Sequence, residues 1–282
     1  MLLVCVIFWG WSFVATKIAV EYVNPFELLA IRYIFGLPIL FVILFTKKIK
    51  LQFEKRDKIA ILLGSAILTT HFLIQITGLK YTSATNTGWI ISVTPLILAV
   101  LAFFFLKEKI GRNQIFGIVI ATIGILLLVS KGNLSEFSWL KSTGDWLVLG
   151  SAHTWAFYAV ATRYVSQRCN PLAVTVGVLA PSALLILLYV AITSDWSKFL
   201  HLPFEPMLAL IFLGVFALGL AHWFWQSGMA QLGAARAGIF LYLEPLATTA
   251  LAVPYLHEEF GLFGAVGGFL VLAGVYVAEK KK

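Results

Sequence analysis

Long apolar runs follow one another along the whole chain, separated by short polar connectors. Each run has about the length of a membrane-spanning helix, which takes about 20 predominantly apolar residues. Strands of a membrane barrel would instead be about ten residues long and alternate in polarity, and the chain shows no such alternation. A backbone in lipid must satisfy its own hydrogen bonds. The pattern therefore predicts an all-α integral membrane protein with ten transmembrane helices, at about 1–20, 25–46, 58–79, 84–106, 112–130, 145–163, 171–192, 206–230, 236–256 and 261–278.

Composition supports this prediction. Of the 282 residues, 60% are hydrophobic and 12% are charged, whereas a soluble domain has about 45–50% apolar and about 25% charged residues. The two cysteines, Cys5 and Cys169, provide no disulfide framework. The first apolar run is expected to be a retained helix, because it has neither the basic start nor the cleavage site of a signal peptide.

Lysine and arginine are distributed unevenly over the connectors, and this asymmetry predicts the orientation. With the N-terminus inside, 15 of the 21 Lys and Arg residues lie in inner connectors and 4 in outer ones. Both termini are therefore expected to be cytoplasmic. The net charge of +8 follows from the same asymmetry, so it calls for no nucleic-acid partner.

The chain repeats itself with opposite orientation. At an offset of 150 residues, 12 of the 47 positions from 78 to 124 are identical, and an offset of 146 pairs Trp9 with Trp155 and Lys17 with Arg163. The two units, residues 1–130 and 145–282, each hold five predicted helices, and an odd number makes them enter the membrane in opposite directions. Inverted repeats around a site at mid-membrane are typical of secondary transporters that work by alternating access.

The repeated motifs resemble a known family. The run Trp9-Gly10-Trp11-Ser12-Phe13-Val14-Ala15-Thr16-Lys17, followed by Pro25 and Arg32, resembles the first helices of an EamA-type repeat of the drug/metabolite transporter superfamily. Similar motifs follow in both halves: Pro95, Glu108, Gly117 and Gly124, and then Leu243-Glu244-Pro245, Glu258, Gly267 and Gly274. The resemblance covers the whole chain and implies a carrier of the bacterial inner membrane that exports amino acids or other small metabolites.

Polar and aromatic side chains near mid-membrane are the candidate substrate-binding residues, because polar groups are costly at that depth. Aromatic walls suit an apolar, aromatic or cationic substrate, and amides suit the two ends of a zwitterion. The same residue types also hold helices together, and the sequence leaves both readings open. The candidates are Trp9, Trp11, His71, Gln75, Asn86, Trp89, His153, Trp155, His222, Trp225, Gln226 and Tyr242.

Charged residues inside the predicted spans admit two interpretations. Glu244 is the only acidic residue deep in a span, and it either couples transport to protons or belongs to a distortion of the helix at Pro245. Arg32 either holds a substrate carboxylate or is a structural residue with an unidentified partner.

Charged residues near the ends of the spans are expected to be structural. We expect Lys17 and Arg163 to extend toward the membrane surface, with Lys17 paired to Glu21. Glu108 and Glu258 are expected to act as hinges or caps.

Two glycine pairs are spaced seven residues apart: Gly117 with Gly124, and Gly267 with Gly274. Such small residues let helices approach closely, either as a scaffold within the chain or as the face of a homodimer.

Motifs for enzymatic chemistry are absent from the sequence. It contains no phosphate loop and no nucleophile elbow, and its five histidines are scattered without metal-ligand spacing. We therefore expect no enzyme, cofactor or metal, but a secondary transporter of a small organic metabolite, with an amino acid as the favoured class. The alternatives are a facilitator or exchanger for a sugar or a quaternary amine, and a membrane enzyme acting on lipid through His257, Glu258 and Glu259.

Overall fold

The computed structural model describes residues 1–129, 140, 142–256 and 262–280, and within them it contains helices and no strand. Helices occupy the described residues of each of the ten predicted segments, and three of these segments contain an interruption. The helices are α1 (Leu2–Ala19), α2 (Pro25–Thr46), α3 (Lys55–Lys80), α4 (Ala84–Ile91), α5 (Thr94–Leu106), α6 (Arg112–Val129), α7 (Thr143–Arg168), α8 (Pro171–Thr193), α9 (Phe204–Phe212), α10 (Ala221–Leu232), α11 (Ala234–Ile239), α12 (Glu244–Leu256) and α13 (Leu262–Glu279).

Side-chain caps fix where several helices begin. The Asn24 side chain accepts hydrogen bonds from the backbone of Phe26 and Glu27, and the Glu27 carboxylate accepts one from the Asn24 backbone. Ser142 and Asp145 form the same reciprocal cap at α7. These contacts satisfy backbone donors that a helix start leaves free.

Three of the predicted spans are interrupted. The span at 84–106 breaks between α4 and α5, next to Pro95, and the span at 236–256 breaks at a 3-10 turn, Phe240–Leu243, next to Pro245. Proline lacks a backbone donor, which weakens the helix at these points. The third interruption is a π-helical stretch, Leu213–Leu220, between α9 and α10. The two breaks next to Pro95 and Pro245 lie at positions related by the 150-residue offset.

Among the described residues, seven helical segments are long and apolar enough to cross a membrane. They are Leu2–Ala19, Pro25–Thr46, Lys55–Lys80, Ala84–Leu106, Pro171–Thr193, Phe204–Leu232 and Ala234–Leu256. Two shorter apolar helices, Arg112–Leu127 and Ala265–Glu279, lie within α6 and α13. The remaining predicted span corresponds to α7, which is long but more polar.

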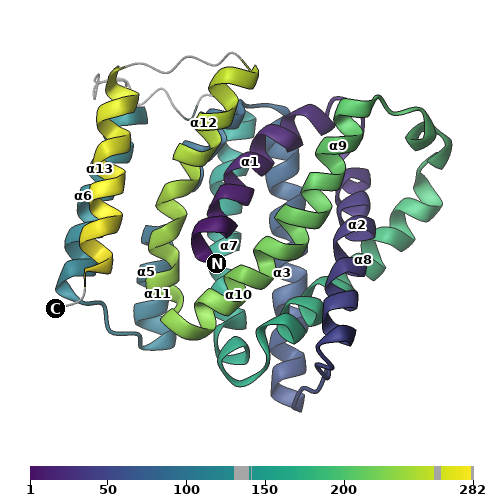
Figure 1. The fold of residues 1–282 in the computed structure, drawn as a ribbon, viewed down its shortest axis with the longest axis horizontal. Coiled ribbons are helices and arrows are strands. Elements are labelled where there is room, and N and C mark those ends of the chain that lie inside the picture. Colours follow the sequence, from purple (N-terminus) through teal and green to yellow (C-terminus); the bar gives the residue numbers. More distant parts are fainter. Residues whose placement is uncertain (130–139, 141, 257–261, 281–282) are drawn as a thin grey trace.

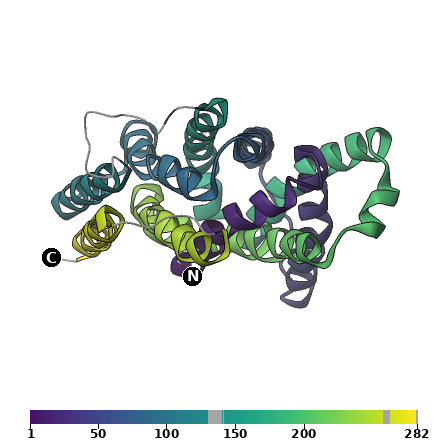
Figure 2. The same ribbon diagram turned by 90° about the horizontal axis from the view of Figure 1, so that it is seen from above.

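The helices form an elongated bundle, with α6 and α13 at one edge and α8 at the other (Figures 1 and 2). The connectors at 47–54 and 107–111 lie at the lower end in Figure 1. We call this the positive end, because these connectors carry Lys47, Lys48, Lys50, Lys107 and Lys109.

Glycines allow α6 and α13 to pack closely. A Cβ added to Gly117 would lie 2.4 Å from the carbonyl oxygen of Gly274, and one added to Gly124 would lie 2.7 Å from that of Gly267. The pairing of an early residue with a late one shows that the two helices are antiparallel. The close approach expected from the glycine spacing is thus made within one chain, and a homodimer stays a prediction.

Candidate substrate-binding site

A small cavity lies in the middle of the bundle. Its walls come from eight of the helices and from the 3-10 turn before α12. The lining residues are Trp9, Ser12, Phe13, Arg32, His71, Phe72, Gln75, Ile91, Thr94, Trp155, His222, Leu241 and Glu244.

Aromatic rings close one side of this cavity. The rings of Trp9 and Trp155 meet edge to face with centroids 4.7 Å apart, and the His222 ring lies 5.2 Å from Trp9 and 5.6 Å from Trp155. This is the favoured geometry for aromatic pairs. Because the rings contact one another, a substrate that stacks on them has to part them.

Both histidines of the cavity are oriented by backbone carbonyls. His71 Nδ1 lies 2.9 Å from the Ser151 oxygen, and His222 Nδ1 lies 3.0 Å from the Ala217 oxygen. A carbonyl only accepts, so Nδ1 donates in both rings, and a neutral ring is left with Nε2 as an acceptor. In the described part of the chain, the buried Nε2 of His222 has no hydrogen-bond partner.

Two buried charges line the same cavity. Arg32 and Glu244 are each 3% exposed. The Arg32 guanidinium carbon lies 4.7 Å from the centre of the Phe72 ring, and the described residues provide neither an ion pair nor a hydrogen bond for this side chain. The structural partner expected for Arg32 is therefore not found among them.

Glu244 lies at the helix break, as its position before Pro245 predicts. Its backbone oxygen accepts a hydrogen bond of 2.9 Å from the Thr248 hydroxyl, which also contacts the Gly10 oxygen at 3.0 Å. Its carboxylate forms no ion pair with a described residue, and it borders the cavity. The Thr248 side chain thus satisfies the backbone at the break, and the Glu244 carboxylate does not take part in this contact.

Equivalent positions of the two halves meet across the cavity. Trp9 and Trp155 are related by the 146-residue offset. The 150-residue offset relates three further lining pairs, namely Phe72 with His222, Ile91 with Leu241, and Thr94 with Glu244. The cavity therefore lies where the two repeats face each other.

The structure brings together five of the twelve candidate residues on this cavity: Trp9, His71, Gln75, Trp155 and His222. It adds Arg32 and Glu244, and also Phe72 and Thr94, which the sequence analysis had not selected. Phe72 and Thr94 could have been found from the repeat, because the 150-residue offset pairs them with His222 and Glu244.

Five other candidates lie outside the cavity. Trp11 is 37% exposed and lines a groove between α1, α9 and α12. Asn86 donates to the Asp145 carboxylate at 2.6 Å and so joins α4 to α7. The side chain of His153 is exposed, with Nδ1 2.9 Å from the Leu149 oxygen of its own helix. Trp89 and Tyr242 line a separate, largely apolar pocket next to α6.

The last two candidates, Trp225 and Gln226, lie beneath the cavity, toward the positive end. Trp225 is fully buried, with its ring 5.5 Å from that of Trp9. Gln226 donates to the Tyr158 hydroxyl at 2.7 Å and accepts from the Ser166 hydroxyl. Neither side chain lines the cavity.

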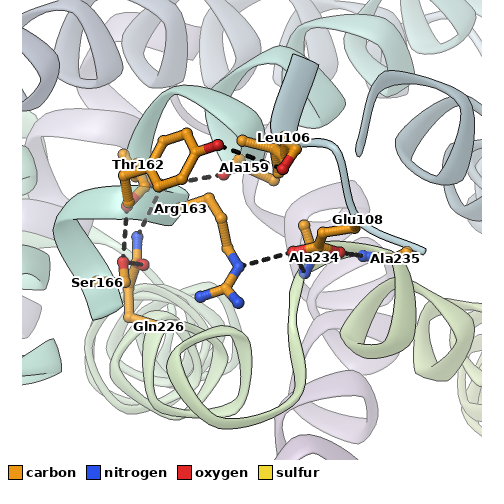
Figure 3. Close-up of polar contacts among 10 residues, drawn as sticks. Leu106, Glu108, Ala159, Thr162, Arg163, Ser166, Gln226, Ala234 and Ala235 are labelled. Atoms are coloured by element: carbon orange, nitrogen blue, oxygen red, sulfur yellow. Dashed lines mark hydrogen bonds and ion pairs between the residues drawn. The ribbon is translucent and has the colours of Figure 1, made fainter. Parts of the chain in front are cut away.

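A polar cluster joins α7 and α11 to the connector that follows α5 (Figure 3). Arg163 Nε donates to the Glu108 carboxylate at 2.9 Å, and the backbone N–H groups of Ala234 and Ala235 donate to the same carboxylate, each at 2.9 Å. We call these four residues the Glu108 cluster. Glu108 is a cap, as expected, but it caps α11 of the other half. The expectation that Arg163 extends to the membrane surface is wrong, because a carboxylate lies within reach.

Lys17, the repeat partner of Arg163, is also held by the protein. Its Nζ donates to the backbone oxygens of Leu79 at 3.1 Å and of Thr82 at 2.8 Å. The expected pair with Glu21 is not formed, because the end of α3 offers carbonyl acceptors closer by. Glu258, Glu259 and His257 lie outside the described residues.

Comparison with known proteins identifies the family. The model of the EamA-like transporter family matches residues 1–130 and again residues 142–279. The uncharacterized transporter YyaM of Bacillus subtilis is 29% identical over 99% of this chain and 92% of its own length. The WAT1-related protein At3g02690, chloroplastic, of Arabidopsis thaliana is 27% identical over 96% of this chain and 67% of its own length.

One solved crystal structure has the same fold, with a TM-score of 0.77 at 20% sequence identity, over 98% of this chain and 96% of the other. The family and the names of its members indicate a transporter rather than an enzyme. Together with the apolar helices, they make the chain a multi-pass membrane protein. The chain belongs to the EamA-like transporter family of the drug/metabolite transporter superfamily.

Proposed function

We propose that the protein is a secondary transporter that exports a small organic metabolite, with an amino acid as the substrate class. We place it in the bacterial inner membrane, with ten membrane crossings and both termini in the cytoplasm. The observation that carries the proposal is the central cavity, which equivalent residues of two repeats line at two helix breaks. Broken helices that border a site between repeats are a recurring design of secondary transporters.

Alternating access is the mechanism that this arrangement supports. The buried Trp225 and Gln226 and the Glu108 cluster follow the cavity residues along α10, α7 and the end of α5, toward the positive end. The cluster joins the end of α5, in the first half, to α7 and α11, in the second. Entry of substrate from this end therefore requires the halves to move apart and the Arg163–Glu108 ion pair to break.

The lining residues favour an amino acid over the alternatives. A quaternary amine would suit the aromatic rings and Glu244, but it would place its charge in a cavity that also contains an unpaired Arg32. A sugar has no anionic group for Arg32. An amino acid provides both an anionic and a cationic group.

Counterflow in liposomes containing the purified protein tests this function. The panel consists of radiolabelled apolar, aromatic and charged amino acids, sugars and quaternary amines, each with and without a proton gradient. We expect exchange of amino acids, strongest for aromatic ones. If only sugars or only quaternary amines exchange, the substrate class is that one and not an amino acid. Failure of every compound to exchange in folded protein would contradict the proposal. A response to the gradient would show proton coupling and make Glu244 and the cavity histidines the candidate proton sites.

A further inference from the structure

Unpartnered polar atoms gather around the central cavity. Five buried side-chain polar atoms, on Arg32, Thr94, His222, Trp225 and Thr249, have no hydrogen-bond partner in the described part of the chain. Three of them, Arg32 Nε, Thr94 Oγ1 and His222 Nε2, belong to residues that line this one cavity. A buried polar group without a partner destabilises the protein, so a concentration of such groups at one place points to a ligand that supplies the missing partners.

The polar groups that line the cavity have two kinds of chemistry. Arg32 is a pure donor with a fixed positive charge. Glu244 provides acceptors when it is ionised, and the Nε2 atoms of neutral His71 and His222 are acceptors because their Nδ1 atoms donate to carbonyls. The cavity thus offers one cationic donor and a separate set of acceptors, and no ion pair joins Arg32 to Glu244.

We infer that the cavity binds a zwitterionic α-amino acid with an apolar or aromatic side chain, whose carboxylate is held by Arg32 and whose ammonium group is held by Glu244 and the histidine acceptors. This inference rests on the proposed function and assigns charge recognition within it. Trp9, Trp155 and Phe72 provide the surface for the side chain. Arg32 suits the first task because its guanidinium binds a carboxylate with two parallel hydrogen bonds.

Thermal shifts of the purified protein with three probes test the assignment without requiring transport. The probes are L-phenylalanine, phenethylamine, which lacks the carboxylate, and 3-phenylpropionate, which lacks the ammonium group. In the wild type, we expect phenylalanine to bind at least about tenfold more tightly than either relative, since each relative leaves a buried charge unpaired.

Two variants then separate the charges. Arg32→Gln is expected to weaken phenylalanine and 3-phenylpropionate by about thirtyfold or more while affecting phenethylamine little. Glu244→Gln is expected to show the opposite pattern, and Arg32→Lys to restore part of the phenylalanine affinity. Arg236→Gln is the matched control, because Arg236 pairs with Glu279 away from the cavity and should leave the order of the three probes unchanged.

Counterflow distinguishes the two levels of the proposal. If Arg32→Gln weakens all three probes equally, or if phenylalanine does not stabilise the wild type, the charge assignment is overturned. The proposed function stands in that case, provided that the wild type still exchanges members of the panel. If phenylalanine binds through Arg32 but no compound exchanges, the site stands and the transport proposal fails.

Discussion

At the scale of single residues, the direction of a side chain decides its role more than its depth in the membrane does. His153 and Trp155 are two positions apart on α7, yet Trp155 borders the cavity and His153 is exposed. Sequence alone placed both near the middle of the sixth span and could not separate them. Helix rotation is set by packing, and in a chain with apolar residues on every face no single stripe reveals it.

This difference provides a matched prediction. Trp155→Ala removes a ring that contacts Trp9 and His222. We expect it to reduce counterflow of the best panel substrate about tenfold, which corresponds to the loss of about 1.4 kcal/mol of stacking. His153→Ala should stay within about twofold, because an exposed ring on the same helix has no stacking contact to lose. Equal losses in the two variants would contradict the placement of the cavity wall.

At the scale of elements, repeated motifs predicted more than composition did. The offset that aligns the halves marks both proline-linked breaks, and the glycine spacing predicted the close packing of α6 with α13. The π-helical stretch, Leu213–Leu220, had no such signal. It packs against α2, where a Cβ on Gly36 would lie 2.4 Å from the Gly214 oxygen. A contact between distant segments of this kind is invisible to local patterns.

Glycine substitutions test the helix packing. Gly117→Ala would force a methyl group to within 2.4 Å of the Gly274 oxygen, and overpacking of this kind costs about 1–3 kcal/mol. Gly150→Ala is the control, because its added carbon has only one neighbour, at 4.0 Å. We expect a lower apparent Tm in detergent for Gly117→Ala and no decrease for Gly150→Ala. A normal Tm for Gly117→Ala would show that α6 and α13 are farther apart than described.

At the scale of the whole molecule, contacts between distant residues hold the two halves together. The sequence predicted the type of some of these contacts but not their partners. Glu108 was expected to be a cap, but its target is a helix start more than a hundred residues away. Arg163 was expected to reach the membrane surface, because its partner could not be identified without the fold. The two-repeat pattern indicated that a site would lie between the halves. That Arg32 lines this site became visible only in the folded structure.

Breaking the Glu108 cluster should make the positive end open more often. In a Cys169→Ser background, Cys5 is the only remaining cysteine, and it is fully buried against α10, with its thiol 3.2 Å from the Ala221 oxygen. We expect Glu108→Gln to increase the rate of Cys5 alkylation by N-ethylmaleimide by about fivefold or more, since removing one charge of a buried pair is strongly destabilising. Glu279→Gln is the control, because it breaks the more exposed Arg236 pair at the same end.

A substrate that occupies the cavity should reverse part of this effect if it favours the closed state. No change in Cys5 reactivity in Glu108→Gln would remove the cluster from the proposed mechanism.

The pairing of Thr94 with Glu244 has a consequence for the direction of flux. In a carrier whose halves exchange conformations, the two open states would be mirror versions of each other only if equivalent positions carried the same residues. Here one position of the pair can ionise and the other cannot. In such a carrier, the two faces of the membrane would meet chemically different sites, with unequal affinities and unequal rates of release. In such a carrier, this asymmetry would set the transport rate in each direction. The gradients alone would set the equilibrium distribution of substrate across the membrane.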